Sequence, residues 1–213
     1  MEHQGQVWHT EVMTPAEEEV LRTLGTLEAL KSFYLAGGTA LALRLGHRRS
    51  LDLDFFNREG FSEDRLLGQL RALRDLSVIS KESETLHLHL CGVKVSLLSY
   101  QYPMLYPLSS LSDVAIADPR DIGCMKISAI ASRGTKRDFV DLYQLAQHER
   151  LEHLLTLFEN KFADVRYNMV HILKSLTYFK DADREPMPDV LMPLSWDQVK
   201  EFFTKEVPRI SRL

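Results

Sequence analysis

The stretch LAGGTALALRLGHRRSLDLDFF, residues 35–56, decides the fold expected for this chain. An apolar run ends at Gly37 and Gly38, which is typical of a buried strand that leads into a turn. Thr39 is the expected cap of a helix, and Gly46 ends that helix. The stretch therefore predicts a strand, a glycine turn and a helix, followed by a second strand.

The second strand carries two acidic residues. Residues 51–56 alternate apolar side chains with Asp52 and Asp54, so both carboxylates are expected on one face. Two carboxylates so close together repel each other unless a cation lies between them. Mg²⁺ prefers a few carboxylate oxygens together with phosphate oxygens of a substrate. Two such ions can activate an attacking hydroxyl and stabilise a leaving pyrophosphate, so we predict that Asp52 and Asp54 are metal ligands.

The glycine turn comes one helix before these carboxylates. Because Gly37 and Gly38 lack side chains, a phosphate can approach the backbone N–H groups of the helix start, and the hydroxyl of Thr39 can add a donor. The turn and the two aspartates should meet at the same end of adjacent strands. Considered alone, a glycine turn before a helix usually serves only the fold, and two aspartates usually lie on an exposed surface without binding a metal. Their order within eighteen residues favours a nucleotide site.

The remaining sequence predicts a mixed α/β part followed by a helical part. A capping box from Thr14 to Glu17 starts a helix before the quoted stretch, and alternating segments on either side of Cys91-Gly92 predict an antiparallel hairpin. Further helices are expected at residues 62–76, 119–133, 139–148 and 195–203, and one or two more within residues 152–179. We therefore predict an α/β (α+β) domain at residues 1–115, with a mixed sheet flanked by helices, and an all-helical domain at residues 116–213.

Composition and charge restrict the class of protein. The chain has 213 residues, a net charge of -4 and 45% apolar residues, which argues against a broadly basic nucleic-acid-coating protein. Cys91 and Cys124 lie far apart without metal-type spacing, so free thiols in a reducing compartment are expected. No run of about 18 apolar residues occurs, and the first residues contain no apolar signal core. We therefore expect a cytoplasmic protein that does not span a membrane.

A second block, KISAIASRGTKRDFVDLYQL at residues 126–145, concentrates charge. Lys126 and Arg133 fall on one side of the expected helix, where they could bind a triphosphate as charge-assisted donors. Asp138 opens the next helix, where a carboxylate serves as a cap and as a partner of the helix dipole. The alternative is a solvated charged face with an ordinary cap. Together with the first block, the set favours nucleotide binding.

The two blocks resemble the motifs of the DNA polymerase β-like nucleotidyltransferase superfamily. Within it, they are most similar to the AbiEii/AbiGii family, the toxins of type IV toxin–antitoxin systems, over roughly residues 15–205. The resemblance implies a nucleotidyltransferase-type fold and Mg²⁺-dependent transfer of an NMP from an NTP to a hydroxyl. The acceptor could be an RNA such as tRNA, a protein side chain or a nucleotide, and a cognate antitoxin would be a partner.

The same resemblance implies site residues. It places Lys126 and Asp138 in the catalytic site. Asp141 is an alternative to Asp138, but the helical pattern predicts that Asp141 is exposed. Asp52 and Asp54 would hold the metal, and the site would lie between the two domains. The nucleotide would be bound by Gly37, Gly38, Thr39, Arg49, Lys126 and Arg133.

One departure from the superfamily affects catalysis. A third carboxylate is usual on a later strand, but Ser96 occupies the aligned position in GVKVSLLSY, with Lys94 on the same strand face. The general base is then open among Asp138, Glu82 and Glu84, or no protein base at all. A catalytically silent nucleotide-binding module that acts through a partner protein is therefore the alternative function, and helix–sheet packing without any ligand is a third.

Three further groups have two interpretations each. The basic run from His47 to Arg49 is either a helix end or a contact for the triphosphate or an RNA backbone. His87 and His89 share one face of the hairpin, where the polar side of a sheet is favoured over a metal role. The aromatic residues after residue 177 favour helix packing over base stacking.

Overall fold

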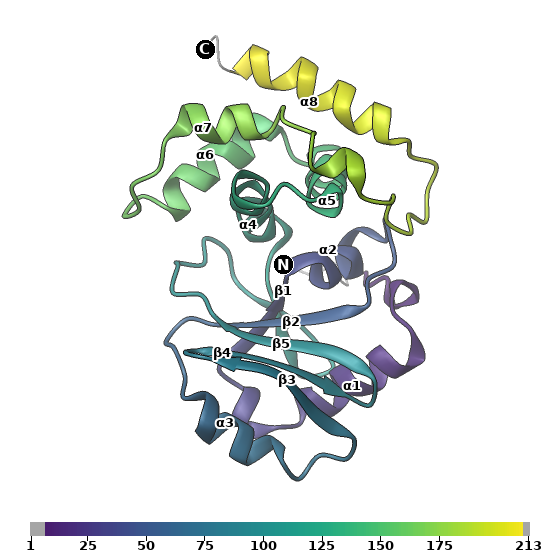
Figure 1. Cartoon of the computed structure of the whole chain (residues 1–213), viewed down its shortest axis with the longest axis vertical. Helices are drawn as coiled ribbons and strands as arrows, with labels where there is room; N and C mark the ends of the chain where they lie inside the picture. The colour runs from purple at the N-terminus through teal and green to yellow at the C-terminus, as the bar shows by residue number, and fades with distance from the viewer. Residues whose placement is uncertain (1–6, 211–213) are drawn as a thin grey trace, which may run out of the picture. The chain divides into compact units, whose positions relative to one another are not determined.

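The structure is a computed structural model of the chain, and it describes residues 7–210. The chain forms two compact units. Met1–Pro103 and Pro107–Ala117 form the first, called the sheet unit, and Met104–Tyr106 and Asp118–Leu213 form the second, called the helical unit. Figure 1 shows a twisted sheet with helices in the first and helices alone in the second.

The sheet unit begins with a helix whose start follows from its sequence. Thr14 accepts a hydrogen bond from the N–H of Glu17, and the Glu17 carboxylate accepts one from the N–H of Thr14, which confirms the predicted capping box. The elements of this unit are η1 (Thr10–Val12), α1 (Pro15–Gly25), η2 (Glu28–Leu30), β1 (Phe33–Ala36), α2 (Gly37–Leu45), β2 (Asp52–Asn57), α3 (Glu63–Leu70), β3 (Leu76–Glu82), β4 (Thr85–Leu90), β5 (Val93–Ser99), β6 (Ser109–Leu111) and β7 (Val114–Ile116).

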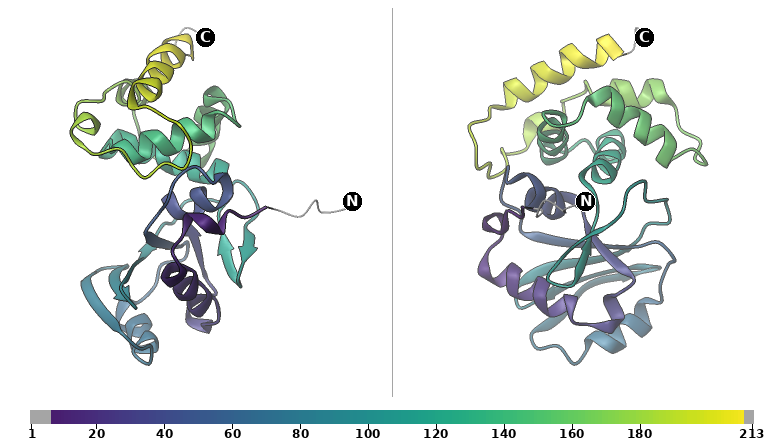
Figure 2. Two further views of the ribbon diagram at one scale, coloured as in Figure 1. Left: turned by 90° about the vertical axis from the view of Figure 1, so that its right-hand side faces the viewer. Right: turned by 180° about the vertical axis from the view of Figure 1, so that it is seen from behind.

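The seven strands form one mixed sheet in the order β3-β4-β5-β2-β1-β7-β6. The β1–β7 and β2–β5 pairs are parallel, and the other pairs are antiparallel. The predicted hairpin around Cys91-Gly92 is present as β4 and β5. Helices α1 and α3 lie against the sheet, as Figures 1 and 2 show.

The two faces of the sheet differ in chemistry because residues alternate along each strand. One face is buried and apolar, with Leu35, Leu53, Phe55, Leu86, Leu88, Val95 and Leu97 in register. The other is called the polar face, and it carries Asp52, Asp54, His87, His89, Lys94 and Ser96. The apolar face packs into the core, so the polar face is where candidate catalytic and ligand-binding residues lie.

The helical unit contains α4 (Pro119–Ser132), α5 (Lys136–Ala146), α6 (Leu151–Lys161), α7 (Met169–Ser175), η3 (Ala182–Arg184) and α8 (Trp196–Ile210). The ring of Phe139 packs against the rings of Phe179, Trp196 and Phe203, with centroids 5.2, 5.8 and 5.5 Å away. The predicted packing role of the C-terminal aromatic residues is therefore confirmed. Along residues 7–210, no helix is both long and apolar enough to cross a membrane.

A buried ion pair lies inside the helical unit. Lys161 donates to Asp121 at 2.7 Å, and both side chains are fully buried. The Asp121 carboxylate also accepts the N–H groups of Leu105 and Tyr106, so it fixes the segment 104–106 to this unit. Both cysteines are free, as predicted, and burial raises the pKa of the Cys124 thiol to about 12, which keeps it protonated.

Several predicted elements need correction. The helix expected at residues 62–76 ends at Leu70, and the chain enters the unpredicted strand β3 at Leu76. Strands β6 and β7 were also not predicted. Thr39 is not a cap, because α2 begins at Gly37 after Ala36. Asp138 is not a cap either: Thr135 caps α5, and Asp138 lies in its first turn.

Candidate active site

Asp52 and Asp54 lie on one face of β2, as predicted. Both are partly exposed, whereas Leu53 and Phe55 between and beyond them are buried. In the sheet, Asp54 is opposite Ala36 of β1 on one side, and both aspartates face β5 on the other. The strand therefore presents two carboxylates side by side at the middle of the polar face.

The glycine turn lies against one of these carboxylates. Gly37 has φ +71°, which L side chains rarely adopt, and a Cβ built there would lie 3.1 Å from Oδ2 of Asp54. Ala36 precedes α2 without a side-chain cap, and the first turn of the helix contains no acidic residue. A helix start of this kind favours an anion. The predicted neighbourhood of turn and carboxylate is thus present within the sheet unit.

Thr39 holds the two parts of this arrangement together. Its side chain is buried, its hydroxyl donates to the backbone carbonyl of Asp52, and it lies 2.8 Å from the hydroxyl of Ser50. The residue therefore ties α2 to the start of β2. A contact between Thr39 and a phosphate, as the sequence predicts, would require the hydroxyl to leave these partners.

The strand β5 adds two neighbours to the carboxylates, and β4 adds a third residue behind them. Lys94 is opposite Asp52, and its ammonium lies 3.9 Å from Oδ2. This exposed pair contributes little energy. Ser96 is opposite Asp54, is almost fully buried, and its hydroxyl lies 3.0 Å from Nδ1 of His87 on β4. The sequence analysis missed this contact, although the hairpin register around Cys91-Gly92 places His87 opposite Ser96.

The two carboxylates fit a magnesium ion. They supply hard oxygen ligands that are partly open to solvent, and Mg²⁺ is commonly held by one or two carboxylates together with phosphate oxygens and water. Within the described part of the chain, no group of three or more His, Cys, Asp or Glu residues has a metal-binding arrangement.

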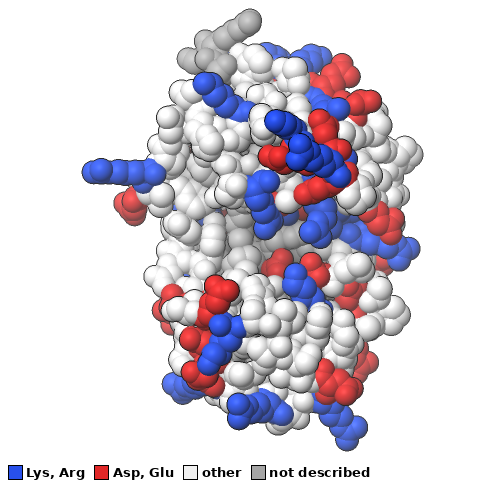
Figure 3. Space-filling view, in the orientation of Figure 1, with Lys and Arg blue, Asp and Glu red and all other residues white. Residues whose placement is uncertain are grey.

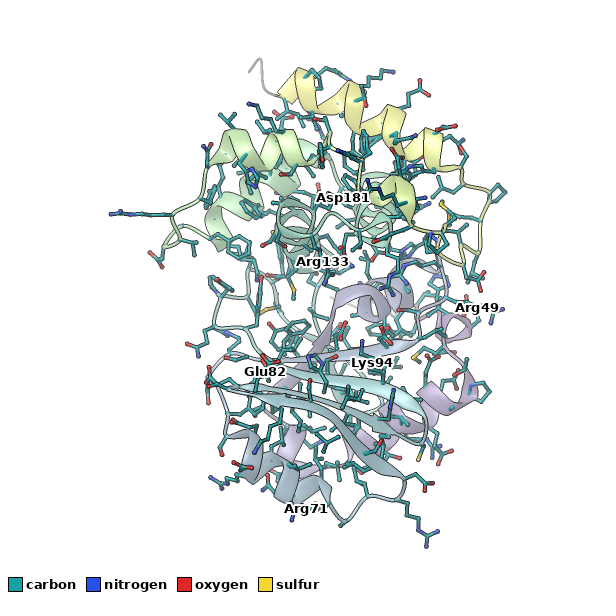
Figure 4. All side chains as sticks on the ribbon, in the orientation of Figure 1. Arg49, Arg71, Glu82, Lys94, Arg133 and Asp181 are labelled. Carbon is teal, nitrogen blue, oxygen red and sulfur yellow. The ribbon has the colours of Figure 1, made fainter. Side chains whose placement is uncertain are left out.

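The second predicted block forms a buried ionic cluster inside the helical unit. The ammonium of Lys126 lies 3.0 Å from Asp138 and 2.6 Å from Asp141. Arg133 donates to both oxygens of Asp138 at 2.9 and 3.1 Å, and Thr135 donates to Asp138 at 2.7 Å. Lys126 is 6% exposed, whereas the side chain of Arg133, labelled in Figure 4, is 64% exposed. Arg133 is therefore the more accessible of the two cations.

Asp141 is the clearest correction in this block. The helical pattern predicts an exposed residue, but its side chain is fully buried. Asp138 and Asp141 are one turn apart on α5, so both face Lys126 on α4. Asp141 thus belongs to the cluster as a partner of Lys126.

The same cluster sets the protonation of Asp138. Burial alone would raise its pKa, but the charges of Lys126 and Arg133 and the hydroxyl of Thr135 lower the pKa to about 2. A general base works best when its pKa lies near the working pH. Asp138 is therefore a weak proton acceptor and serves better as a fixed negative charge.

The remaining predicted residues belong to the run from His47 to Arg49 and to the β3–β4 region. His47, Arg48 and Arg49 directly follow the end of α2, as the helix-end interpretation predicts. His47 and Arg48 are buried there, and only Arg49 of the run is exposed. Glu82 is the last residue of β3, and Glu84 lies in the turn between β3 and β4. Figure 4 labels Arg49, Glu82 and Lys94, and on the face drawn in Figure 3 the described Lys and Arg side chains are interspersed with Asp and Glu.

Two solved structures share this fold. JHP933 from Helicobacter pylori matches with a TM-score of 0.54 and 18% identity over 94% of each chain. MenT4, a nucleotidyltransferase toxin from Mycobacterium tuberculosis H37Rv, matches with a TM-score of 0.59 and 17% identity, over 93% of this chain and 84% of that chain. The fold is that of a nucleotidyltransferase, as predicted.

Sequence comparison identifies the family. The family model described as "Nucleotidyl transferase AbiEii toxin, Type IV TA system" matches residues 19–89 and 96–211. A protein of Aquifex aeolicus (strain VF5), "Uncharacterized protein aq_aa25", is 37% identical over 197 residues, which cover 90% of this chain and 94% of that protein. The chain belongs to the AbiEii family of nucleotidyltransferase toxins of type IV toxin–antitoxin systems. The predicted family and enzyme class are thereby confirmed.

Proposed function

We propose that this enzyme transfers an NMP from an NTP to an acceptor hydroxyl, with loss of pyrophosphate, in a Mg²⁺-dependent reaction. The observation that carries the proposal is the close approach of the Gly37 turn to the carboxylate of Asp54, which leaves no room for a side chain at Gly37, while Asp52 lies on the same strand face. A phosphate-binding turn and a metal-binding carboxylate pair are the two parts that such a reaction needs.

The residues of the sheet unit then have separate roles. Asp52 and Asp54 hold Mg²⁺, and the backbone of Gly37 and Gly38 binds the phosphates. When bound, Mg²⁺ neutralises phosphate charge and activates the attacking oxygen. Thr39 keeps the turn and the carboxylates in register through its bond to the Asp52 carbonyl.

Basic residues elsewhere in the chain complete the proposal. Arg133, whose side chain is largely exposed while it donates to Asp138, binds the triphosphate, and Arg49 contributes a second exposed cation. Lys126 acts with Asp138 and Asp141 by fixing the helices that present Arg133. These assignments follow from exposure and from the family resemblance.

The acceptor and the partner follow from the family. We propose an RNA such as tRNA as the acceptor, with a protein hydroxyl as the alternative, and a cognate antitoxin as the partner. The family description as a type IV toxin–antitoxin system supports the antitoxin. The cytoplasm is the proposed compartment, since NTPs and tRNA are present there.

Labelled nucleotides test this function directly. Purified protein is incubated with Mg²⁺, each α-labelled NTP in turn, and total cellular RNA, beside an Asp52→Asn/Asp54→Asn double variant. An Asp64→Asn/Asp197→Asn variant is the matched control, because it removes two exposed carboxylates from surface ion pairs. Label in RNA or protein is expected with the wild type and the control, but not with the first variant. Transfer that survives the loss of Asp52 and Asp54 would contradict the proposed roles.

A catalytically silent nucleotide-binding module remains the second candidate. Ser96, rather than a carboxylate, is opposite Asp54 on β5. In that case the wild type would bind an NTP with Mg²⁺ and would release no pyrophosphate. Separate measurements of NTP binding and of pyrophosphate release on the wild type therefore distinguish the two candidates.

A further inference from the structure

A row of three polar side chains crosses the centre of the polar face. Asp54 on β2 is opposite Ser96 on β5, and Ser96 is opposite His87 on β4. Adjacent strands lie about 5 Å apart, so an acceptor hydroxyl bound beside Asp54 comes within reach of Ser96. The Ser96 hydroxyl in turn lies 3.0 Å from Nδ1 of His87.

The proposed transfer needs a group that accepts a proton. The acceptor oxygen attacks the α-phosphorus as its O–H bond breaks, and the proton must go to a base within hydrogen-bonding distance. Asp52 and Asp54 are assigned to the metal, and Asp138 is a weak proton acceptor. Histidine changes its charge between about pH 5 and 8, which suits this task near neutral pH.

We propose that Ser96 and His87 act as a pair that removes the proton of the acceptor hydroxyl. Ser96 contacts the acceptor, takes its proton and passes its own proton to Nδ1 of His87, which holds its other proton on Nε2. The electron pair of the broken O–H bond forms the new bond to phosphorus, and pyrophosphate leaves with the electrons of the old one. The imidazolium then returns the proton to water. This inference rests on the proposed function.

The surroundings of His87 allow this role. His87 is partly exposed, whereas Ser96 is almost fully buried, so Ser96 is held in place while His87 can exchange a proton with solvent. The charged and titratable groups on the same face are Asp52 and Asp54 from β2, Lys94 from β5, His89 from β4 itself and Glu82 from β3. Figure 4 labels Glu82 and Lys94.

The test replaces the base and keeps the hydrogen bond. His87→Asn retains a polar atom for Ser96 but cannot accept the proton, and His87→Gln is measured beside it in case one variant fails to fold. His89→Asn is the matched control, because His89 lies on the same strand and face, one row away. For both His87 variants kcat is expected to fall about 100-fold with an unchanged KM for the NTP, while His89→Asn stays within twofold.

The pH profile separates proton transfer from a merely structural role. The wild-type rate is expected to rise with pH as the proton acceptor loses its proton, and the His87 variants should lose this rise. If they keep the wild-type kcat or the same rise, the proposal is overturned while the transferase function stands. If the wild type itself transfers no label in the presence of Mg²⁺, the proposed function fails and this inference fails with it.

Discussion

Charged side chains in this protein occupy two contrasting environments. Asp52 and Asp54 remain partly exposed on the polar face, where a cation and a substrate can reach them. Lys126, Asp138 and Asp141 are buried together, and their charges are compensated within the protein. A buried carboxylate destabilises the folded protein unless it is paired with a cation. The packing of α4 against α5 therefore depends on Lys126 pairing with Asp138 and Asp141.

This compensation predicts an acid-sensitive stability for the helical unit. Asp138 has a pKa lowered from 3.8 to about 2, so its carboxylate stabilises the folded state above pH 4, and this contribution is lost as the pH falls through 2. The whole effect amounts to about 2 kcal/mol, and about half of it is lost by pH 3.

Urea unfolding of the wild type and of Asp138→Asn at pH 6 and pH 3 measures this effect. Asn cannot titrate, so the difference in stability between the two proteins should shrink by about 1 kcal/mol at the lower pH. A difference that stays constant between the two pH values would show that the ion cluster does not lower the pKa of Asp138.

The hydroxyl of Thr39 is expected to contribute both to stability and to activity. Thr39→Val preserves the shape but removes the hydroxyl that donates to the Asp52 carbonyl. We expect the free energy of unfolding to fall by about 1–2 kcal/mol and the transfer rate to fall with it, because the start of β2 loses its tie to α2. Thr39→Ser keeps the hydroxyl and should stay close to the wild type in both. Equal behaviour of the Val and Ser variants would argue against the tie.

Among elements, the start of α2 depends most on a single residue type. Gly37→Ala places a side chain at φ +71° and a Cβ 3.1 Å from Asp54. The backbone conformation alone costs about 1–2 kcal/mol, and Asp54 must move. We predict lower thermal stability together with a loss of transfer activity.

Gly68 in α3 provides the opposite case. A Cβ there meets no atom within 4 Å, and its φ is not in the left-handed region. Gly68→Ala should therefore stabilise the protein by about 0.5–1 kcal/mol and leave transfer unchanged. Thermal unfolding of both variants checks the pair, and a stabilising Gly37→Ala would contradict the backbone argument.

Helices and strands with a clear pattern of apolar residues or a clear cap could be predicted from the sequence, whereas those without such a pattern could not. The β4–β5 hairpin alternates clearly because one face is buried, and α1 carries a complete capping box. Strand β3 is an edge strand whose residues are mostly exposed, so its sequence does not alternate between apolar and polar residues. The leucines before it fit a helical pattern, so the expected helix was drawn too long. Strands β6 and β7 have three residues each, too few to show a period.

The candidate site was predictable to a similar degree. Local motifs revealed the Gly37 turn and the two aspartates, because all three lie within one short stretch. The burial of Asp141 depends on which helix packs beside α5, and the contact of Ser96 with His87 depends on strand register. Burial and pairing of this kind come from tertiary structure, which single-residue patterns do not contain.

At the scale of the whole molecule, the helical unit includes a segment that precedes the last strands of the sheet. Leu105 and Tyr106 donate their N–H groups to the buried Asp121, at 3.1 and 3.0 Å. Tyr106 also lies under the guanidinium of Arg120, 3.4 Å from the ring centroid. The segment therefore contributes to the stability of the helical unit.

Two fragments test this contribution. Residues 104–213 retain the donors to Asp121, whereas residues 118–213 leave its carboxylate with Lys161 alone. Hydrogen bonds to a charged group contribute about 1.5–3 kcal/mol each, so the shorter fragment should be less stable by about 3 kcal/mol or more in urea unfolding. The same midpoint for both fragments would show that Asp121 does not depend on these donors.

The interleaving of the two units has a consequence for synthesis on the ribosome. Strand β1 gains its parallel neighbour β7 only after residue 116 has emerged, so the sheet stays incomplete while residues 104–106 are already made. The N–H groups of Leu105 and Tyr106 cannot form their hydrogen bonds until Asp121 has also emerged. A nascent chain that stops near residue 103 therefore contains neither unit in finished form, and an interrupted translation product of this toxin would be released without a completed sheet.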